Sequence, residues 1–129
     1  MTVNHQKELA TFLGSRLVSY NVCLSKTLGS ITASIFLNQL LYWFGKSIDP
    51  EWIYKRVEEF QEETGLTPDQ QLSAQKRLVA LGILEVKRKG VPPTRSFKIN
   101  HKRLYELCSE FVAKQRKLAN QTTEKPTNE

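Results

Sequence analysis

The chain has 129 residues, 40% of them hydrophobic and 25% charged, with a formal net charge of +6, so we expect one compact core that folds without disulfide staples. Cys23 and Cys108 lie far apart and beside no partner motif, which argues against a disulfide framework or a metal cluster and favours a reducing cytoplasm. Residues 1–10 lack the apolar core of a secretory signal, and the longest apolar run, residues 31–45, is shorter than the ~20 residues of a membrane span.

Residues 1–29 are expected to form a helical extension. Apolar residues recur at helical spacing between residues 3 and 13 and predict a short amphipathic helix. In the segment that follows, Asn21 can cap a turn of helix that ends at Gly29, and a short extended piece around Tyr20 is the alternative.

A longer helix is predicted to begin after Ser30, which has the side chain of an N-cap, and to run to about Lys46. Its apolar residues point nearly all round the helix axis, so we expect it to be the buried centre of the domain, with Asn38 and Gln39 on its exposed strip. Pro50 then disfavours helical geometry at the preceding residue and ends this element.

A small strand and a short helix follow. Residues 52–55, Trp-Ile-Tyr-Lys, are bulky and β-prone but few, so they predict a small strand. Helical spacing returns over residues 57–64, and Gly65 supplies the left-handed residue that ends this helix. Four of its side chains are expected to form a solvated acidic face: Glu58, Glu59, Glu62 and Glu63.

The next helix carries the strongest local signal in the sequence. Thr67 is placed as an N-cap, Pro68 occupies the first helical position, and Gln70 can reach back as in a capping box. The helix is predicted to run to about Leu81, with Ala74 and Leu78 facing inward. Its opposite face carries Asp69, Ser73, Lys76 and Ala80.

The remainder of the chain predicts a hairpin and a terminal helix. Residues 83–87 and 96–99 alternate like strands and are joined by a basic loop that contains Gly and Pro, which indicates a β-hairpin. Residues 101–120 return to helical spacing. The polar composition of residues 121–129 predicts a disordered tail.

Charge is distributed unevenly along the chain. Five acids lie within residues 58–69, whereas residues 73–103 contain Glu85 as their single acid. The basic residues of that second segment are Lys76, Arg77, Lys87, Arg88, Lys89, Arg95, Lys98, Lys102 and Arg103. This asymmetry suggests that one side of the domain meets a polyanion.

The order of elements over residues 30–100 predicts a winged helix-turn-helix, that is, a mainly α fold with a small β-hairpin (α+β) and extra N- and C-terminal helices. The residues that carry a family resemblance are Trp52–Lys55, Glu63–Thr67, Ala74, Lys76, Leu78, Leu81–Leu84, Lys87–Pro92 and Phe97–Asn100. On these residues the chain resembles, from Ile31 to Leu107, the winged-helix domains of phage and plasmid replication proteins and related small DNA-binding proteins.

The resemblance implies that residues 68–81 are a recognition helix and that residues 87–95 are a wing. A helix with small and basic side chains can enter the major groove, and a basic hairpin can lie over neighbouring phosphates. We therefore expect a binding protein for double-stranded DNA, acting as a transcription regulator or replication initiator of a virus, plasmid or mobile element. The expected contact residues are Asp69, Ser73, Lys76, Arg77, Lys87, Arg88, Lys89 and Arg95.

Two alternatives remain open from the sequence. Leu72 and Val79 are apolar on the flank of the exposed helix face, so the same fold can serve as a protein-interaction module that holds a partner. The terminal helices can also pair two copies into a homodimer. We expect no catalysis, cofactor, metal site or small-molecule substrate, because no phosphate loop or nucleophile elbow is present and Tyr54 has no His-x-His metal pair beside it.

Overall fold

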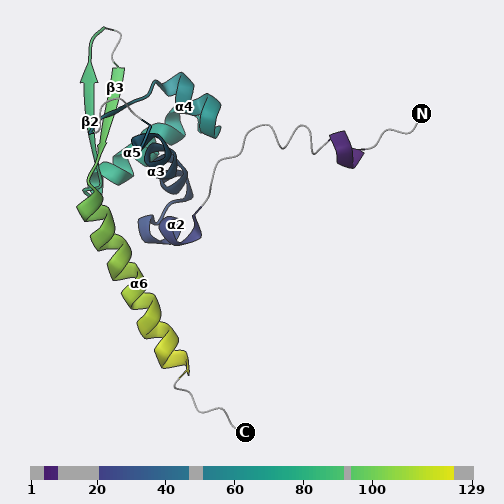
Figure 1. Cartoon of the computed structure of the whole chain (residues 1–129), viewed down its shortest axis with the longest axis vertical. Coiled ribbons are helices and arrows are strands. Elements are labelled where there is room, and N and C mark those ends of the chain that lie inside the picture. The colour runs from purple at the N-terminus through teal and green to yellow at the C-terminus, as the bar shows by residue number, and fades with distance from the viewer. Residues whose placement is uncertain (1–4, 9–20, 47–50, 92–93, 124–129) are drawn as a thin grey trace.

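The structure is an α+β arrangement in which helices pack around the central helix α3 (Ile31–Phe44) and against a small antiparallel sheet (Figure 1). It is a computed structural model that describes residues 5–8, 21–46, 51–91 and 94–123. After a helical turn at residues 5–8, the elements are α2 (Val22–Leu28), α3 (Ile31–Phe44), β1 (Ile53–Tyr54), α4 (Val57–Thr64), α5 (Pro68–Ala80), β2 (Leu84–Lys89), β3 (Thr94–Ile99) and α6 (His101–Thr123). The predicted α+β class is therefore confirmed, with a small antiparallel sheet of three strands among the described residues. Most of the predicted helix over residues 3–13, the proposed break at Pro50 and the tail after Thr123 lie outside the described residues.

Local capping explains where the helices begin and end. The Asn21 side chain accepts a hydrogen bond from the Leu24 amide at 2.8 Å, so this segment forms a helix. In front of α5, the Gln70 amide donates to Thr67 Oγ1 at 3.2 Å and the Thr67 amide donates to Gln70 Oε1 at 3.0 Å. The predicted capping box is confirmed. Gly65 ends α4 at φ 79°, where a left-handed residue was expected.

The sheet has the strand order β1-β3-β2, with both pairs antiparallel. Phe97 lies at its centre, opposite Ile53 on one side and Val86 on the other. The hairpin is longer than predicted because pairing continues through Arg88 opposite Arg95 and through one further pair beyond it. Each strand of the hairpin therefore has six residues, and basic side chains fall inside the strands.

Three phenylalanine rings form the centre of the core and join α3, α4 and β3. Phe36, Phe60 and Phe97 are all fully buried. The Phe36 ring stacks on the Phe60 ring with centroids 4.5 Å apart and meets the Phe97 ring edge-on at 5.5 Å. These ring contacts fix α4 and the sheet on the same side of α3.

The helix α3 is the buried centre of the domain, as predicted, over residues 32–41, all of which are buried or half-buried. Ile31 in the first turn and Tyr42 in the last turn are 58% and 53% exposed, so the exposed residues of this helix lie at its two ends. Asn38 and Gln39 do not lie on an exposed strip; both are half-buried. The helix ends at Phe44, two residues earlier than predicted.

The last helix, α6, packs on the core through its first turns and then extends away from the hairpin (Figure 1). It has 23 residues, which makes it about 34 Å long. The helix α6 continues to Thr123, so the prediction of a disordered tail from residue 121 was wrong for residues 121–123. Residues of high helix propensity before residue 121 favour the continuation of the helix. Within the described residues, no helix combines the length and apolarity needed to cross a bilayer.

The contact between α2 and α6 places both cysteines at one junction. Cys23 on α2 is exposed and Cys108 on α6 is half-buried, and both thiols are free. Burial raises the pKa of the Cys108 thiol, and the neighbouring charge of Cys23 acts in the same direction, whereas a hydrogen bond with Thr27 opposes it.

Candidate nucleic-acid interface

The helix α5 is covered on one face and open on the other. Ala74 and Leu78 are 1% and 0% exposed, on the face that packs against α3. The opposite face presents Asp69, Ser73 and Lys76, all of which are exposed as the sequence predicted. Because the capping box fixes the start of α5, it also fixes the direction in which these side chains point.

The three consecutive cations of the hairpin are exposed but do not share a face. Residues that alternate along a strand point to opposite sides of a sheet. Arg88 lies opposite Arg95 and so belongs to the inner side, which faces α5. Lys87 and Lys89 belong to the outer side, where the ammonium of Lys87 lies 4.7 Å from the centroid of the Trp52 ring.

Arg95, predicted as a phosphate contact, is instead buried, with only 9% of its surface exposed. Its Nη2 donates to Gln71 Oε1 at 2.9 Å, and Nη1 makes a longer contact of 3.5 Å with Gln75 Oε1. Burial lowers the pKa of Arg95, the nearby charge of Arg88 adds to this, and Glu58 opposes it. The physical reason for the burial is strand alternation, since Arg95 is two residues from the inward-facing Phe97.

Gln71 is a polar residue that connects the inner side of the hairpin to the helices, and the sequence analysis did not identify it. It is fully buried, and its Nε2 donates to the carbonyl oxygens of Val57 at 3.1 Å and Leu66 at 3.0 Å. Its Oε1 accepts from Arg95, so one amide joins α4, the turn after it, α5 and β3. The signal was its place on the same stripe as Ala74 and Leu78, three and seven residues later.

Arg77, expected at or beside the groove, is bound to α2. Its Nε donates to the carbonyl oxygen of Leu28 at 2.9 Å, which satisfies a free carbonyl at the end of α2. The structure therefore gives Arg77 a structural contact with α2 on the flank of α5, one turn after Ser73.

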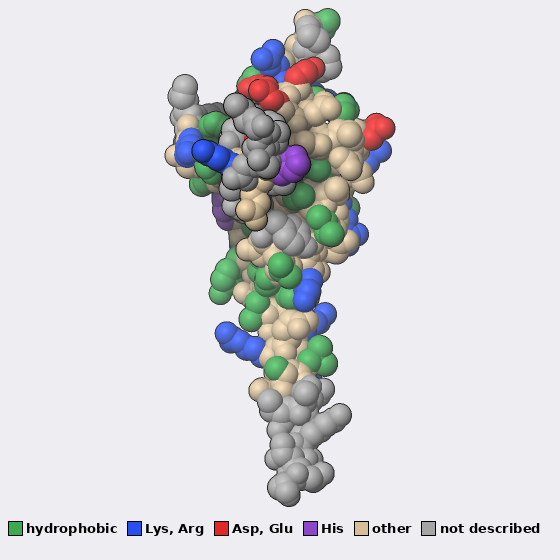
Figure 2. Space-filling view, turned by 90° about the vertical axis from the view of Figure 1, so that its right-hand side faces the viewer, with side chains coloured by type: hydrophobic (Ala, Val, Ile, Leu, Met, Phe, Trp, Pro, Cys, Tyr) green, Lys and Arg blue, Asp and Glu red, His purple; other side chains and the backbone are tan. Residues whose placement is uncertain are grey.

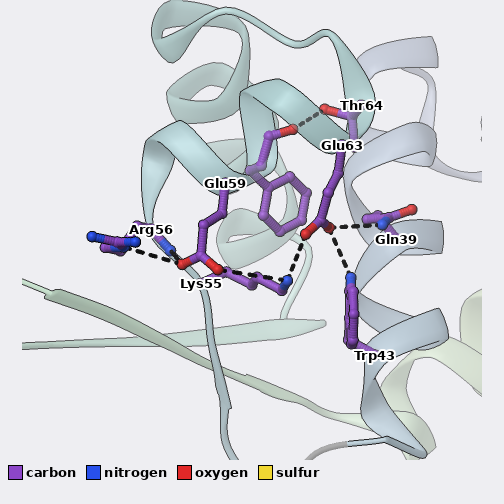
Figure 3. Close-up of polar contacts among 8 residues, drawn as sticks. Gln39, Trp43, Lys55, Arg56, Glu59, Glu63 and Thr64 are labelled. Carbon is purple, nitrogen blue, oxygen red and sulfur yellow. Dashed lines mark hydrogen bonds and ion pairs between the residues drawn. The ribbon is translucent and has the colours of Figure 1, made fainter. Parts of the chain in front are cut away.

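The acidic face of α4 is only partly solvated, so that expectation was wrong for Glu63 (Figure 3). Glu63 Oε1 accepts from Gln39 Nε2 at 2.9 Å and from Trp43 Nε1 at 2.8 Å, and Oε2 lies 2.6 Å from Lys55 Nζ. Burial raises the pKa of Glu63, but the hydrogen bonds from Lys55, Gln39 and Trp43 outweigh it and the pKa is lowered overall. Glu58 and Glu62 are exposed, and acidic side chains are visible at the upper end of the face in Figure 2, the end at which α4 lies.

A pocket of about 250 Å³ lies between the first half of α5 and the hairpin. Its lining consists of Val57, Pro68, Leu72, Gln75, Arg88 and Arg95. Arg95 Nε is buried and has no hydrogen-bond partner among the described residues. Two of the predicted DNA contacts, Arg88 and Arg95, thus meet at a partly open pocket. The expected site therefore divides into an open helix face, a basic outer hairpin face and this pocket.

The described ranges, residues 5–8, 21–46, 51–91 and 94–123, also bear on a metal site. No group of three or more His, Cys, Asp or Glu side chains in these ranges is arranged to hold a metal ion. Comparisons with family models, with curated proteins and with solved structures returned no match.

Proposed function

We propose that residues 30–100 form a winged helix-turn-helix that binds double-stranded DNA, with α5 as the recognition helix and the β2–β3 hairpin as the wing. The observation that carries this proposal is the position of an uncovered helix face beside a hairpin with three exposed cations. In the setting suggested by the sequence resemblance, the protein acts as a transcription regulator or replication initiator of a virus, plasmid or mobile element.

Each group on this surface has a distinct part in the proposed complex. Ser73 and Lys76 lie on the open face of α5, where short and cationic side chains reach base edges and phosphates of the major groove. Asp69 lies in the first turn of α5, where its negative charge interacts favourably with the helix dipole. Its carboxylate can also accept a hydrogen bond from a cytosine amino group. Lys89, near the end of the hairpin, neutralises backbone phosphates.

The test is a binding titration on random-sequence duplex DNA at several salt concentrations. Replacing the three hairpin cations together, K87A/R88A/K89A, is expected to weaken binding on every sequence. The slope of log affinity against log salt should fall by about 0.9 for each DNA phosphate that the variant no longer neutralises, hence by about 0.9 to 2.7 in total.

The matched control replaces three exposed cations of α6, K114A/R116A/K117A, which removes the same net charge at a site remote from the hairpin. This variant is expected to keep a slope close to that of the wild-type protein. Unchanged slope and affinity in the hairpin variant, or an equal loss of affinity in the α6 variant, would remove the wing from the proposal.

A second candidate function is a protein-interaction module, and it has one specific observation in its favour. Leu72 and Val79 on α5 are 40% and 46% exposed, and because they are seven residues apart they lie on the same flank of the helix. Absence of salt-sensitive DNA binding at micromolar protein would favour this function. Loss of DNA binding in Lys76→Ala, with L72S/V79S unaffected, would favour the DNA-binding one.

A further inference from the structure

The pocket between α5 and the hairpin combines a cationic wall with an apolar one. Val57, Pro68 and Leu72 provide the apolar part of the lining. Arg88 and Arg95 provide the cationic part, and they are directly opposite each other on the paired strands β2 and β3. Like charges that lie directly opposite each other on paired strands repel. An anion bound between Arg88 and Arg95 would relieve this repulsion.

Arg95 is the part of this wall that the protein itself leaves unsatisfied. More than nine-tenths of the residue is buried, and its Nε has no hydrogen-bond partner among the described residues. The groups that contact its guanidinium are the neutral amides of Gln71 and Gln75 and the ring of Phe97. Burial and the charge of Arg88 lower the pKa of Arg95, and the nearby charge of Glu58 offsets only part of this. A buried guanidinium held by neutral groups keeps most of its desolvation cost, which a bound carboxylate or phosphate would offset.

We infer that this pocket is a binding site for a small organic anion, with a carboxylate or phosphate group held by Arg88 and Arg95 and an apolar body against Val57, Pro68 and Leu72. The volume of about 250 Å³ is below the roughly 300–1,000 Å³ of pockets for drug-sized ligands, so the ligand is about the size of a single-ring acid. Gln75 lies beside the anion position, where its amide can donate a further hydrogen bond.

The site lies under the first half of α5 and against the hairpin, so its occupant contacts both parts of the proposed DNA-binding surface. A backbone phosphate of bound DNA has the same anionic chemistry as a free metabolite. The apolar lining distinguishes the two, because a sugar–phosphate chain gains little from Val57, Pro68 and Leu72. The proposal therefore commits to a free organic anion, and the experiment separates the two sources.

The test is an NMR titration of the full chain that follows backbone amide signals. The probe is sodium benzoate, and the neutral probe of matched shape is benzamide. Benzoate is expected to produce saturable shifts at Leu72, Gln75 and Arg88 with millimolar affinity, as suits a fragment of this size, and benzamide is expected to bind at least about tenfold more weakly.

Two charge-matched variants on adjacent residues sharpen the test. Arg88→Gln removes a cation from the pocket and should weaken benzoate binding about tenfold or more, whereas Lys87→Gln on the outer hairpin face should leave it unchanged. Both side chains are exposed, and the amide spectra show whether each variant keeps its fold.

Three outcomes would overturn the proposal: equal binding of benzoate and benzamide, equal effects of the two variants, or no saturable shift of the pocket amides. Shifts of these amides with a short DNA duplex but not with benzoate would assign the pocket to a DNA phosphate and would also overturn it.

Discussion

Lys55 Nζ lies 2.6 Å from Glu63 Oε2 and 3.8 Å from the centroid of the Trp43 ring, so this ammonium is held between a carboxylate and an aromatic face (Figure 3). Only 9% of the Lys55 side chain and 19% of the Glu63 side chain are exposed. The pair joins the segment before α4 to the end of α4 and to α3. This ion pair is therefore part of the protein interior and not of its surface.

Replacing Glu63 by Gln is expected to destabilise the fold by about 2–4 kcal/mol, because the buried Lys55 charge loses its nearer carboxylate and keeps only Glu59, whose Oε2 lies 4.0 Å from Nζ. The amide keeps an oxygen for Gln39 and Trp43, which isolates the effect of charge. Urea unfolding measures the change. The control, Glu62→Gln, alters an exposed carboxylate on the same helix and should cost less than about 1 kcal/mol. Equal effects of the two substitutions would contradict the interior role of Glu63.

The stability of the fold should fall on acidification, over a pH range that is set by two carboxylates of α4, Glu59 and Glu63. Backbone hydrogen bonding from Arg56 lowers the pKa of Glu59, and the Glu63 pKa is also lowered from the ordinary value of 4.5. A depressed folded-state pKa means that the unfolded chain takes up protons first. The stabilisation is therefore complete above about pH 5 and is lost as the pH falls through 4.5 toward the folded-state pKa values. Unfolding curves from pH 3 to 7 measure this, and Glu63→Gln should flatten the profile.

Gln71 and Arg95 should behave as one energetic unit. Arg95→Met leaves the fully buried Gln71 oxygen without its donor and is expected to cost about 1–3 kcal/mol, whereas Gln71→Leu breaks three hydrogen bonds and should cost more. In the double variant the penalties should overlap, with a coupling energy of about 1–2 kcal/mol in a double-mutant cycle followed by urea unfolding.

Lys76→Met supplies the control for that cycle, since Lys76 is exposed on the other face of α5. Its effect should add to that of Gln71→Leu without coupling. Additive effects of the Gln71 and Arg95 substitutions would mean that their hydrogen bond carries no net stabilisation.

Gly29→Ala is expected to destabilise the junction of α2 and α5 by about 1–2 kcal/mol. Gly29 has φ 69°, and an added Cβ would lie 2.9 Å from Arg77 Nη2, so the substitution strains the backbone and disturbs the contact of Arg77 with Leu28. Thermal unfolding measures the loss of stability. Gly45→Ala is the matched control, because Gly45 is in the right-handed region with open space around it, and it should be neutral or slightly stabilising.

The sequence predicted those features that are determined within a few residues. The capping box of Thr67 and Gln70 and the turn at Gly65 depend on atoms no more than four positions apart. Helical periodicity likewise predicted the open face that carries Ser73 and Lys76. In each case the chain itself contains both partners of the interaction in one short segment.

The polar interior was not predictable in the same way. Arg95 bonds to Gln71 and Glu63 bonds to Gln39, and in both pairs the partners are 24 residues apart. Such contacts depend on how separate elements pack, which periodicity does not specify. Two of these residues had a usable signal. Gln71 lies on the same helical stripe as Ala74 and Leu78, and Arg95 alternates with Phe97, although the strand was expected to begin only at residue 96.

The packing of α2 on α6 gives the protein a chemical reporter of its own motion. Thiolates, and not thiols, react with alkylating reagents, so the exposed Cys23 is modified before Cys108, whose pKa burial raises. Whenever the two helices separate, Cys108 loses that burial and its reactivity increases. The alkylation rate of Cys108 therefore measures how often this junction opens, without any introduced label.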